Sequence, residues 1–282
     1  MKAIISHDID HLTVWEHTSD LILPKFVVRA NMELVMGKIS IGEYVFRIGD
    51  FFKNKWQRID EVIAFNESMG VPSSFFIGVN NGLGLSYPLK EAAFWIDKVS
   101  KRNIEIGVHG INYDTMDGVK KEYDDFKSSS PALKSFGMRM HYVRKNENTL
   151  HYIEQCGYIY DSTENAFKNP YKIGKMWEFP FQIMDGWVID KDKRWQSQSL
   201  EQAKSNTLKL IEQAHAENLE YLGVIFHDRY FCDSFKTWKN WYIWLVEYLK
   251  ENKIGFVNFH QAIQHLENKK NETAHPNTIF ST

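Results

Sequence analysis

Acidic and imidazole side chains follow directly after several short apolar runs of this chain. After the run at residues 3–6 comes the segment HDIDH at 7–11, in which one residue separates Asp8 from Asp10. Residues two apart on a strand point to the same side, so both carboxylates face one place. Like charges this close repel unless a cation lies between them. The pair therefore predicts a metal-binding carboxylate beside a free one that acts as a base, with an Asp-rich capping turn as the alternative.

Three further apolar runs end in charged or imidazole side chains that could take part in chemistry. These residues are His109, Arg139, His141 and His227. A single histidine after a strand is more often a hydrogen-bonding residue than a ligand. Here several of them share one kind of position, and imidazole together with carboxylate is a normal ligand set for zinc or another divalent ion. The pattern predicts one metal site built from distant parts of the chain.

Alternating elements must position these side chains. Short apolar runs predict strands at 3–6, 74–77, 104–108, 138–142, 158–161, 223–226 and 255–258. Amphipathic segments predict helices at 58–69, 89–101, 117–127, 147–156, 200–217, 238–252 and 261–268. Strands that alternate with helices indicate βαβ units and a parallel sheet. In a parallel α/β barrel the carboxyl ends of all strands lie on one face, where active sites are found.

The chain is interpreted as one domain at 1–268 followed by a polar tail at 269–282. A mainly helical insertion at 12–56 interrupts the alternation after the first strand. It is apolar in places and rich in aromatic residues. We expect it to pack on the barrel as a helical cap, with contact to lipid as the alternative.

Composition limits the classes of function. The 282 residues carry 34 basic and 36 acidic side chains, so the net charge of −2 provides no basic field for nucleic acid. No apolar run approaches the ~20 residues that span a bilayer. Two cysteines exclude a disulfide framework or a cysteine-rich zinc site. The N-terminal apolar stretch is too short for a signal-peptide core, which predicts a cytoplasmic protein of undetermined oligomeric state.

Seven short motifs, in order, resemble the polysaccharide deacetylases with the NodB-homology fold, carbohydrate esterase family 4. They are HDID (7–10), VPSSFF (71–76), IGVHG (106–110), RMHY (139–142), YIYDS (158–162), EFPF (178–181) with Asp185, and FHD (226–228). The resemblance implies an α/β fold, a distorted parallel (β/α) barrel of about seven strands. It also implies a divalent metal, with zinc favoured.

The resemblance assigns a role to each matching residue. It implies that Asp8 is the general base and that Asp10 and His109 bind the metal. By the same resemblance, Arg139 orients the base and the backbone N–H of Tyr142 stabilises the oxyanion. His227 is the general acid, and Asp185 is the carboxylate that tunes it.

Two positions depart from the family pattern. The family has a second metal-binding histidine four residues after the first, where this chain has Tyr113. The family usually has proline where this chain has His141. We hypothesise that His141 replaces the missing ligand. The alternatives are an impaired metal site with His141 as a pocket residue, or an oxygen ligand from Tyr113 or Asp114.

The resemblance implies hydrolysis of an N-acyl group, acetyl or its close variant formyl, from an amino sugar. A cytoplasmic enzyme would meet a small-molecule or lipid-linked amino sugar of surface polysaccharide or lipopolysaccharide biosynthesis. One alternative is a carbohydrate-binding relative that lost its metal, because Tyr113 replaces a ligand. Another is a hydrolase of a non-sugar amide such as a cyclic ureide, which rests on fold-level analogy.

Overall fold

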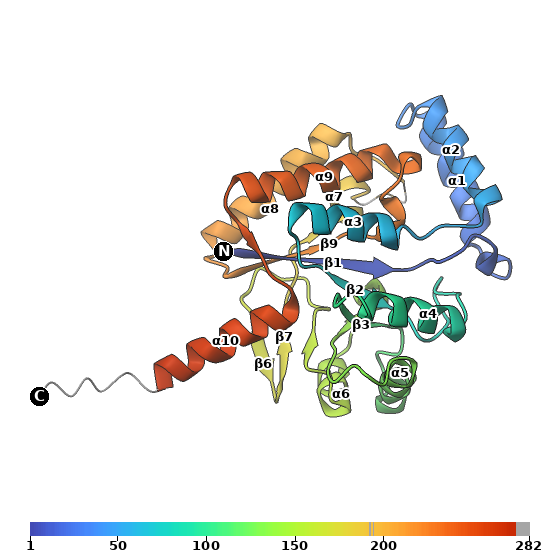
Figure 1. The fold of residues 1–282 in the computed structure, drawn as a ribbon. Coiled ribbons are helices and arrows are strands. Elements are labelled where there is room, and N and C mark those ends of the chain that lie inside the picture. The colour runs from blue at the N-terminus through green and yellow to red at the C-terminus, as the bar shows by residue number, and fades with distance from the viewer. Residues whose placement is uncertain (192, 194, 275–282) are drawn as a thin grey trace, which may run out of the picture.

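The computed structural model describes residues 1–191, 193 and 195–274, with side chains up to residue 269. Its centre is a curled sheet in the order β6-β7-β5-β4-β3-β2-β1-β9-β8, with β10 paired to β1 (Figure 1). The pairings are parallel except for the antiparallel β6–β7 pair. The strands are β1 (Lys2–Ile9), β2 (Ser74–Ile77), β3 (Glu105–Gly110), β4 (Met138–Met140), β5 (Tyr160–Asp161), β6 (Tyr171–Ile173), β7 (Met176–Glu178), β8 (Ile183–Met184), β9 (Tyr221–Ile225) and β10 (Gly255–Phe256).

Helices connect the parallel strands and cover the outside of the sheet (Figure 1). They are α1 (Ile22–Val35), α2 (Ile41–Lys53), α3 (Ile59–Met69), α4 (Leu89–Ser100), α5 (Met116–Ser129), α6 (Thr149–Cys156), α7 (Asp185–Ile189), α8 (Leu200–Ala216), α9 (Lys236–Glu251) and α10 (Phe259–Ala274). Short 3-10 turns lie at η1 (Trp15–His17), η2 (His141–Val143), η3 (Asp228–Tyr230) and η4 (Asp233–Phe235). Within the described residues, no helix has both the length and the apolar composition needed to cross a bilayer.

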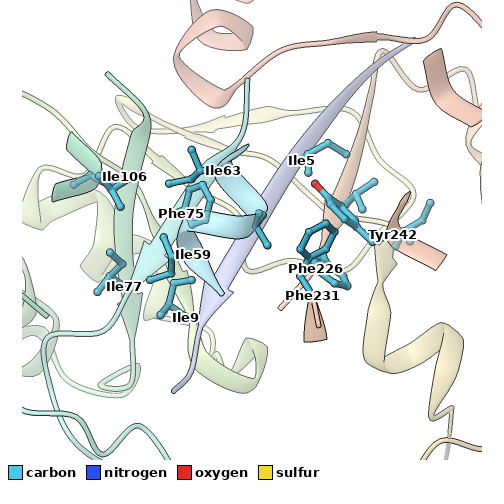
Figure 2. Close-up of a cluster of buried hydrophobic side chains, with 14 of the residues drawn as sticks. Ile5, Ile9, Ile59, Ile63, Phe75, Ile77, Ile106, Phe226, Phe231 and Tyr242 are labelled. Atoms are coloured by element: carbon cyan, nitrogen blue, oxygen red, sulfur yellow. The ribbon is translucent and has the colours of Figure 1, made fainter. Parts of the chain in front are cut away.

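Strand β1 is the centre of the molecule, and its residues 3–9 are all buried. Its odd-numbered side chains pack outward against α3 and α9, as Ile5 and Ile9 show in Figure 2. Behind them the rings of Phe226 and Tyr242 stack with centroids 4.2 Å apart. Alternation along a strand then turns the even-numbered residues to the inner side of the curled sheet. The apolar packing thus fixes the strand from which the two carboxylates project.

The α/β fold-class prediction is confirmed, and each strand predicted from the sequence matches an observed strand to within a few residues. The insertion expected at 12–56 contains the helical pair α1 and α2, which Figure 1 shows beyond the carboxyl end of β1. Strands β6, β7 and β8 and helix α7 were not predicted. They are two to five residues long, too short for a periodic pattern. Helix α10 also continues to Ala274, into the predicted tail, whose residues 275–282 lie outside the described part.

Candidate active site

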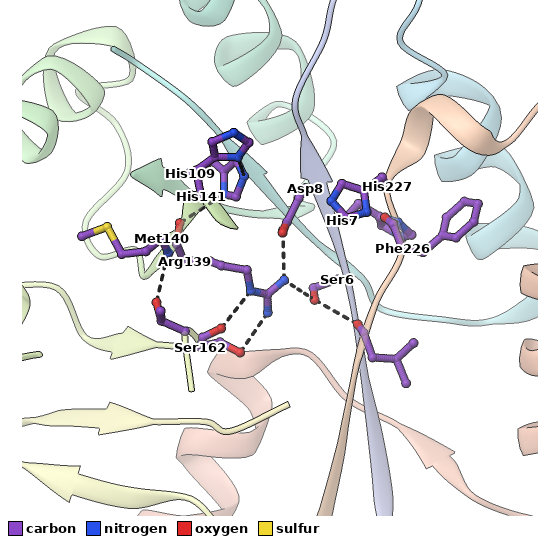
Figure 3. A network of polar contacts seen from close by, with 12 residues as sticks. Ser6, His7, Asp8, His109, Arg139, Met140, His141, Ser162, Phe226 and His227 are labelled. Atoms are coloured by element: carbon purple, nitrogen blue, oxygen red, sulfur yellow. Dashed lines mark hydrogen bonds and ion pairs between the residues drawn. The ribbon is translucent and has the colours of Figure 1, made fainter. Parts of the chain in front are cut away.

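The polar residues expected at strand ends meet at the carboxyl edge of the sheet. Asp8 comes from β1 and Asp10 directly follows it, while His109 comes from β3 and Arg139 from β4. His141 begins η2 directly after β4, and His227 follows β9. Figure 3 shows Asp8, Arg139 and the three histidines converging from separate strands. Because the strands are parallel neighbours, their ends bring together residues more than 200 positions apart in the sequence.

Three ligand-type atoms form a small triangle at this edge. Nε2 of His109 lies 2.9 Å from Nδ1 of His141. Oδ1 of Asp10 lies 3.2 Å from the first nitrogen and 3.3 Å from the second. Burial opposes a charge on Asp10, but the two histidines hold the pKa of its carboxyl well below the ordinary value. The triangle therefore contains an ionised carboxylate and two imidazole nitrogens.

Backbone carbonyls fix which nitrogen each ring presents. Nδ1 of His109 donates to the Arg139 carbonyl at 3.1 Å, and Nε2 of His141 donates to the Leu83 carbonyl at 3.2 Å. A carbonyl can only accept, so in the neutral rings the two facing nitrogens carry lone pairs. Together with Asp10, three acceptors then point at one another. Such an arrangement is favourable only around a cation or a shared proton.

This donor set fits a divalent metal. Ligands at ~2.0–2.1 Å around a tetrahedral zinc lie about 3.3 Å from one another, close to the sides of the triangle. Carbonyls that hold the far nitrogens of both rings are the usual outer partners of metal-binding histidines. The cavity next to the triangle leaves room for a further ligand such as water. Asp10, His109 and His141 would hold the ion.

Asp8 lies beside the triangle and is held by Arg139. Nη1 of Arg139 donates to Oδ1 of Asp8 at 3.0 Å and to Oγ of Ser6 at 2.8 Å. Nε and Nη2 of the same guanidinium donate to the carbonyl and hydroxyl of Ser162, and Figure 3 shows the guanidinium held between these partners. Burial opposes ionisation of Asp8, but Arg139 holds the pKa of Asp8 below its ordinary value. Asp8 is thus an ionised carboxylate in a fixed position.

His227 lies next to Asp10 and is held by Asp185. Nδ1 of His227 donates to Oδ1 of Asp185 at 2.8 Å, and its backbone N–H donates to Oδ2 at 2.7 Å. The Nε2 atom points inward, 3.6 Å from Oδ2 of Asp10. Burial disfavours the charged ring, yet Asp185 and Asp10 together raise the pKa of His227 well above its ordinary value. This geometry suits a proton donor.

A tight turn after β4 carries His141 and Tyr142. Tyr142 and Val143 both adopt left-handed backbone angles, with φ of 55° and 49°. Such angles are uncommon for bulky residues and occur where the surrounding structure imposes them. The rings of His141 and Tyr142 are in contact, tilted by 40° with centroids 4.0 Å apart, and Tyr142 borders the cavity. The turn aims the imidazole of His141 back at β1.

All of these groups open into one cavity of about 1100 Å³. Its floor is polar, and its walls come from α1 and from the segments after β8 and β9. The floor consists of Asp8, Asp10, His109, His141, Asp185 and His227. Aromatic walls are provided by Phe26, Trp187, Trp195, Tyr230, Phe235 and Trp238. The volume suits a sugar-sized or larger ligand.

Other residues considered from the sequence lie elsewhere. The hydroxyl of Tyr113 accepts a hydrogen bond from Nη2 of Arg144 at 3.0 Å, and Asp114 is exposed. Among the described residues, the group of ligand atoms around Asp10 includes neither. His7 faces the core, where its Nδ1 donates to the Phe226 carbonyl at 2.9 Å and burial lowers its pKa to about 3. His7 thus belongs to the core packing and not to the metal triangle.

Several supporting residues were not predicted. Ser6 lies two residues before Asp8 on the same side of β1, so strand alternation could have indicated it. Ser162 belongs to the matched motif YIYDS, but that motif assigned it no role, and the Leu83 carbonyl gives no signal in the sequence. His11, Glu16 and His17 form a second group of ligand-type atoms. In that group the Glu16 carboxylate accepts from the backbone N–H groups of residues 12 and 13, and holds the loop after β1.

Known proteins resemble this one in structure, but the sequence comparisons found no match. No protein-family model matches the chain, and no curated protein matches its sequence. A proposed polysaccharide deacetylase from Mycobacterium smegmatis superposes with a TM-score of 0.61 at 12% identity, covering 95% of this chain and 91% of that one. The PuuE allantoinase superposes with a TM-score of 0.62 at 14% sequence identity, covering 98% of this chain and 91% of that one. Another proposed deacetylase, from Pseudomonas aeruginosa PAO1, superposes with a TM-score of 0.57 at 11% identity, covering 99% of this chain and 92% of that one. The resemblance to the NodB-type barrel is thereby confirmed for the fold.

Proposed function

We propose that this protein is a metal-dependent hydrolase that removes an N-acyl group, acetyl or formyl, from an amino sugar. The observation that carries the proposal is the convergence of three acceptor atoms beside a base and an acid. Asp10, His109 and His141 face one point, and Asp8 and His227 line the same cavity next to it. The deacetylases that share the fold support the same chemical class.

Each proton carrier has a defined task in this reaction. A divalent ion at the triangle would polarise the acyl carbonyl and lower the pKa of a nearby water. Asp8, kept ionised by Arg139, takes the proton of the attacking water. His227, kept charged by Asp185, delivers a proton to the leaving amine. The backbone N–H of Tyr142 is the proposed donor to the oxyanion, and one such donor lowers the barrier by about 3 kcal/mol.

The fold alone supports a wider range of amide substrates than amino sugars. An allantoinase shares the fold, so a cyclic non-sugar amide is the second candidate. The cavity of about 1100 Å³ with its aromatic walls favours the larger ring of a sugar. A lipid carrier on the sugar, a role in surface-polysaccharide synthesis and a cytoplasmic location remain predictions from the sequence.

The decisive experiment measures release of free amine. The zinc-loaded protein is incubated with N-acetylated and N-formylated amino sugars, free and as nucleotide sugars, and separately with cyclic ureides. We expect amine release only from the sugars. Asp8→Asn and His227→Gln should each lower turnover by about 100-fold or more, because each removes one proton carrier.

The controls separate chemistry from folding. Both variants should keep their zinc, since neither residue belongs to the triangle. Lys209→Gln, on the exposed side of α8, should behave as the unmodified protein. Turnover within a few-fold of normal in either active-site variant would remove that residue from the mechanism. A zinc-loaded protein that hydrolyses only the ureides would exclude the sugar assignment.

A further inference from the structure

Helix α2 has its polar face inside and its apolar face outside. Its buried side chains are Glu43, Arg47 and Asp50, spaced for one side of a helix. The opposite side carries Ile41, Val45 and Phe52, of which Phe52 is 87% exposed. A helix that covers a soluble core normally has the reverse arrangement. The outer face of α2 therefore requires an explanation other than packing against the core.

Buried ionic contacts hold α2 in this orientation. Arg47 is fully buried, forms an ion pair with Glu33 of α1, and donates from Nε to the Ser234 carbonyl at 2.7 Å. The Ser234 hydroxyl donates to Oδ2 of Asp50 at 2.6 Å. The backbone N–H of Lys236 donates to Glu43 at 3.1 Å. Rotating the helix to bury its apolar side would break each of these contacts. The buried polar contacts therefore hold the apolar side of α2 outward.

Helix α1, which packs against α2, also has exposed apolar side chains. Leu21, Val28, Met32 and Val35 recur at helical spacing along one side of it, and all four are exposed. We call the combined surface of both helices the α1–α2 face. We include Trp15, which lies just before α1. The exposed large hydrophobic residues of the face are Trp15, Leu21, Val27, Val28, Met32, Val35, Met36, Ile41, Val45, Phe46 and Phe52. Most of the exposed large hydrophobic side chains in the described structure belong to α1, α2 and the residues that flank them.

The exposed charges within the two helices are mainly basic. All of residues 21–56 are described, and the charged residues among them that are classed as exposed are Lys25, Lys38 and Lys53. The acidic residues in this range are Glu33, Glu43 and Asp50, and each is buried with a partner. Outside this range, Asp20 next to Leu21 is partly exposed, but its carboxylate is paired with His17. An apolar face whose exposed unpaired charges are mainly lysines complements an anionic lipid surface.

The face continues into the cavity of the candidate active site. Leu21, Val28 and Met32 are exposed on α1 and also line that cavity. Figure 1 shows the two helices standing beyond the end of β1, the edge at which the site lies. Trp15 is 54% exposed beside the end of α2, where its backbone N–H donates to Asn54 at 3.0 Å. Aromatic side chains of this kind are favoured at the membrane–water boundary.

We propose that the α1–α2 face docks the protein onto the surface of an anionic lipid bilayer, with the cavity opening towards that surface. A second copy of the chain fits the face less well. A two-fold contact would oppose the same lysines on both copies, and it would cover the entrance formed by α1. The docking is tested without substrate or metal, so its outcome is independent of the proposed reaction.

The test is sedimentation of the full chain with vesicles. One set contains phosphatidylcholine alone and another includes about 30 mol% phosphatidylglycerol. We expect binding to the anionic vesicles that weakens about tenfold or more without the anionic lipid, or in about 0.5 M salt. The triple variant Ile41→Ser, Val45→Ser and Phe52→Ser should lower vesicle binding about tenfold or more, since it removes the apolar contact. Substituting Lys25, Lys38 and Lys53 by Gln should remove the dependence on salt.

Matched variants control for general effects of surface changes. Leu89→Ser with Phe94→Ser removes exposed apolar groups of α4, and Lys90, Lys134 and Lys209 changed to Gln remove distant charges. Both controls should bind as the unmodified protein, and all variants should keep its circular dichroism spectrum. Absent binding of the unmodified protein to anionic vesicles, or normal binding by the Ile41/Val45/Phe52 variant, would overturn the proposal. A dimer in light scattering that this variant converts to a monomer would assign the face to a second copy instead.

Discussion

At residue 141, an imidazole stands where the resembling family has proline, and it lies against Asp10 and His109. The sequence left three possibilities for the missing ligand: replacement by His141, replacement by Tyr113 or Asp114, or an impaired site. The geometry supports the replacement by His141, because its Nδ1 faces the Asp10 carboxylate at 3.3 Å while Tyr113 is bound to Arg144. Distance along the chain could not distinguish these options. They differ only in where β4 and the loop after β3 place their side chains.

The zinc content of two variants tests this replacement. His141→Ala should lower zinc affinity by about 100-fold or more, because one of three protein ligands is lost. Tyr113→Phe should keep the metal, since it removes only the hydroxyl that Arg144 contacts. Zinc is counted by elemental analysis after dialysis against a weak chelator. Full occupancy in His141→Ala would leave Asp10 and His109 as the metal ligands and reject the replacement.

At the scale of elements, the neighbouring strands β5 and β7 place two carboxyl groups side by side in the interior. Asp161 and Glu178 are register partners, and both are fully buried. Burial, with Asp161 as the next cause, raises the pKa of Glu178 well above its ordinary value of 4.5. Folding therefore favours the protonated form of Glu178. The stabilisation is complete below about pH 4.5 and is lost as the pH rises through the raised pKa.

Glu178→Gln should reduce this pH dependence. The amide keeps the shape of the side chain and donates as the protonated acid does, but it does not ionise. In urea unfolding at pH 5 and pH 8, the unmodified protein should lose more stability than the variant, by about 2 kcal/mol for one buried charge. Glu220→Gln, an exposed change near β9, serves as the control. Equal losses in Glu178→Gln and the unmodified protein would show that this pair does not share a proton.

At the scale of the whole molecule, the candidate metal site joins β1, β3 and the turn after β4. The unfolded chain does not hold these three parts together, so zinc binding should stabilise the folded state. Zinc at 100 times its dissociation constant contributes about 2.7 kcal/mol, or about 5–10 °C in melting temperature for a chain of this size. Asp10→Asn should show no such increase. An equal increase in both proteins would place the stabilising zinc elsewhere, for example at His11 and His17.

The sequence by itself determined the class of fold and most of the polar floor of the site. Buried strands read as continuous apolar runs, and their ends are visible where a run stops at HDIDH or at His227. Parallel pairing then places those ends together, because this requires only the order of elements and not their packing. Asp8, Asp10, His109 and His227 could therefore be predicted together.

Only the tertiary structure decided what depends on contacts between distant segments. The support of His141 by the Leu83 carbonyl, of Arg139 by Ser162, and the outward apolar side of α2 leave no local pattern in the sequence. The apolar periodicity of α2 indicates a helix with two unlike sides, but it does not say which side faces the protein. That choice depends on the ion pair between Arg47 and Glu33 and on the carbonyl of Ser234, which only the folded chain brings together.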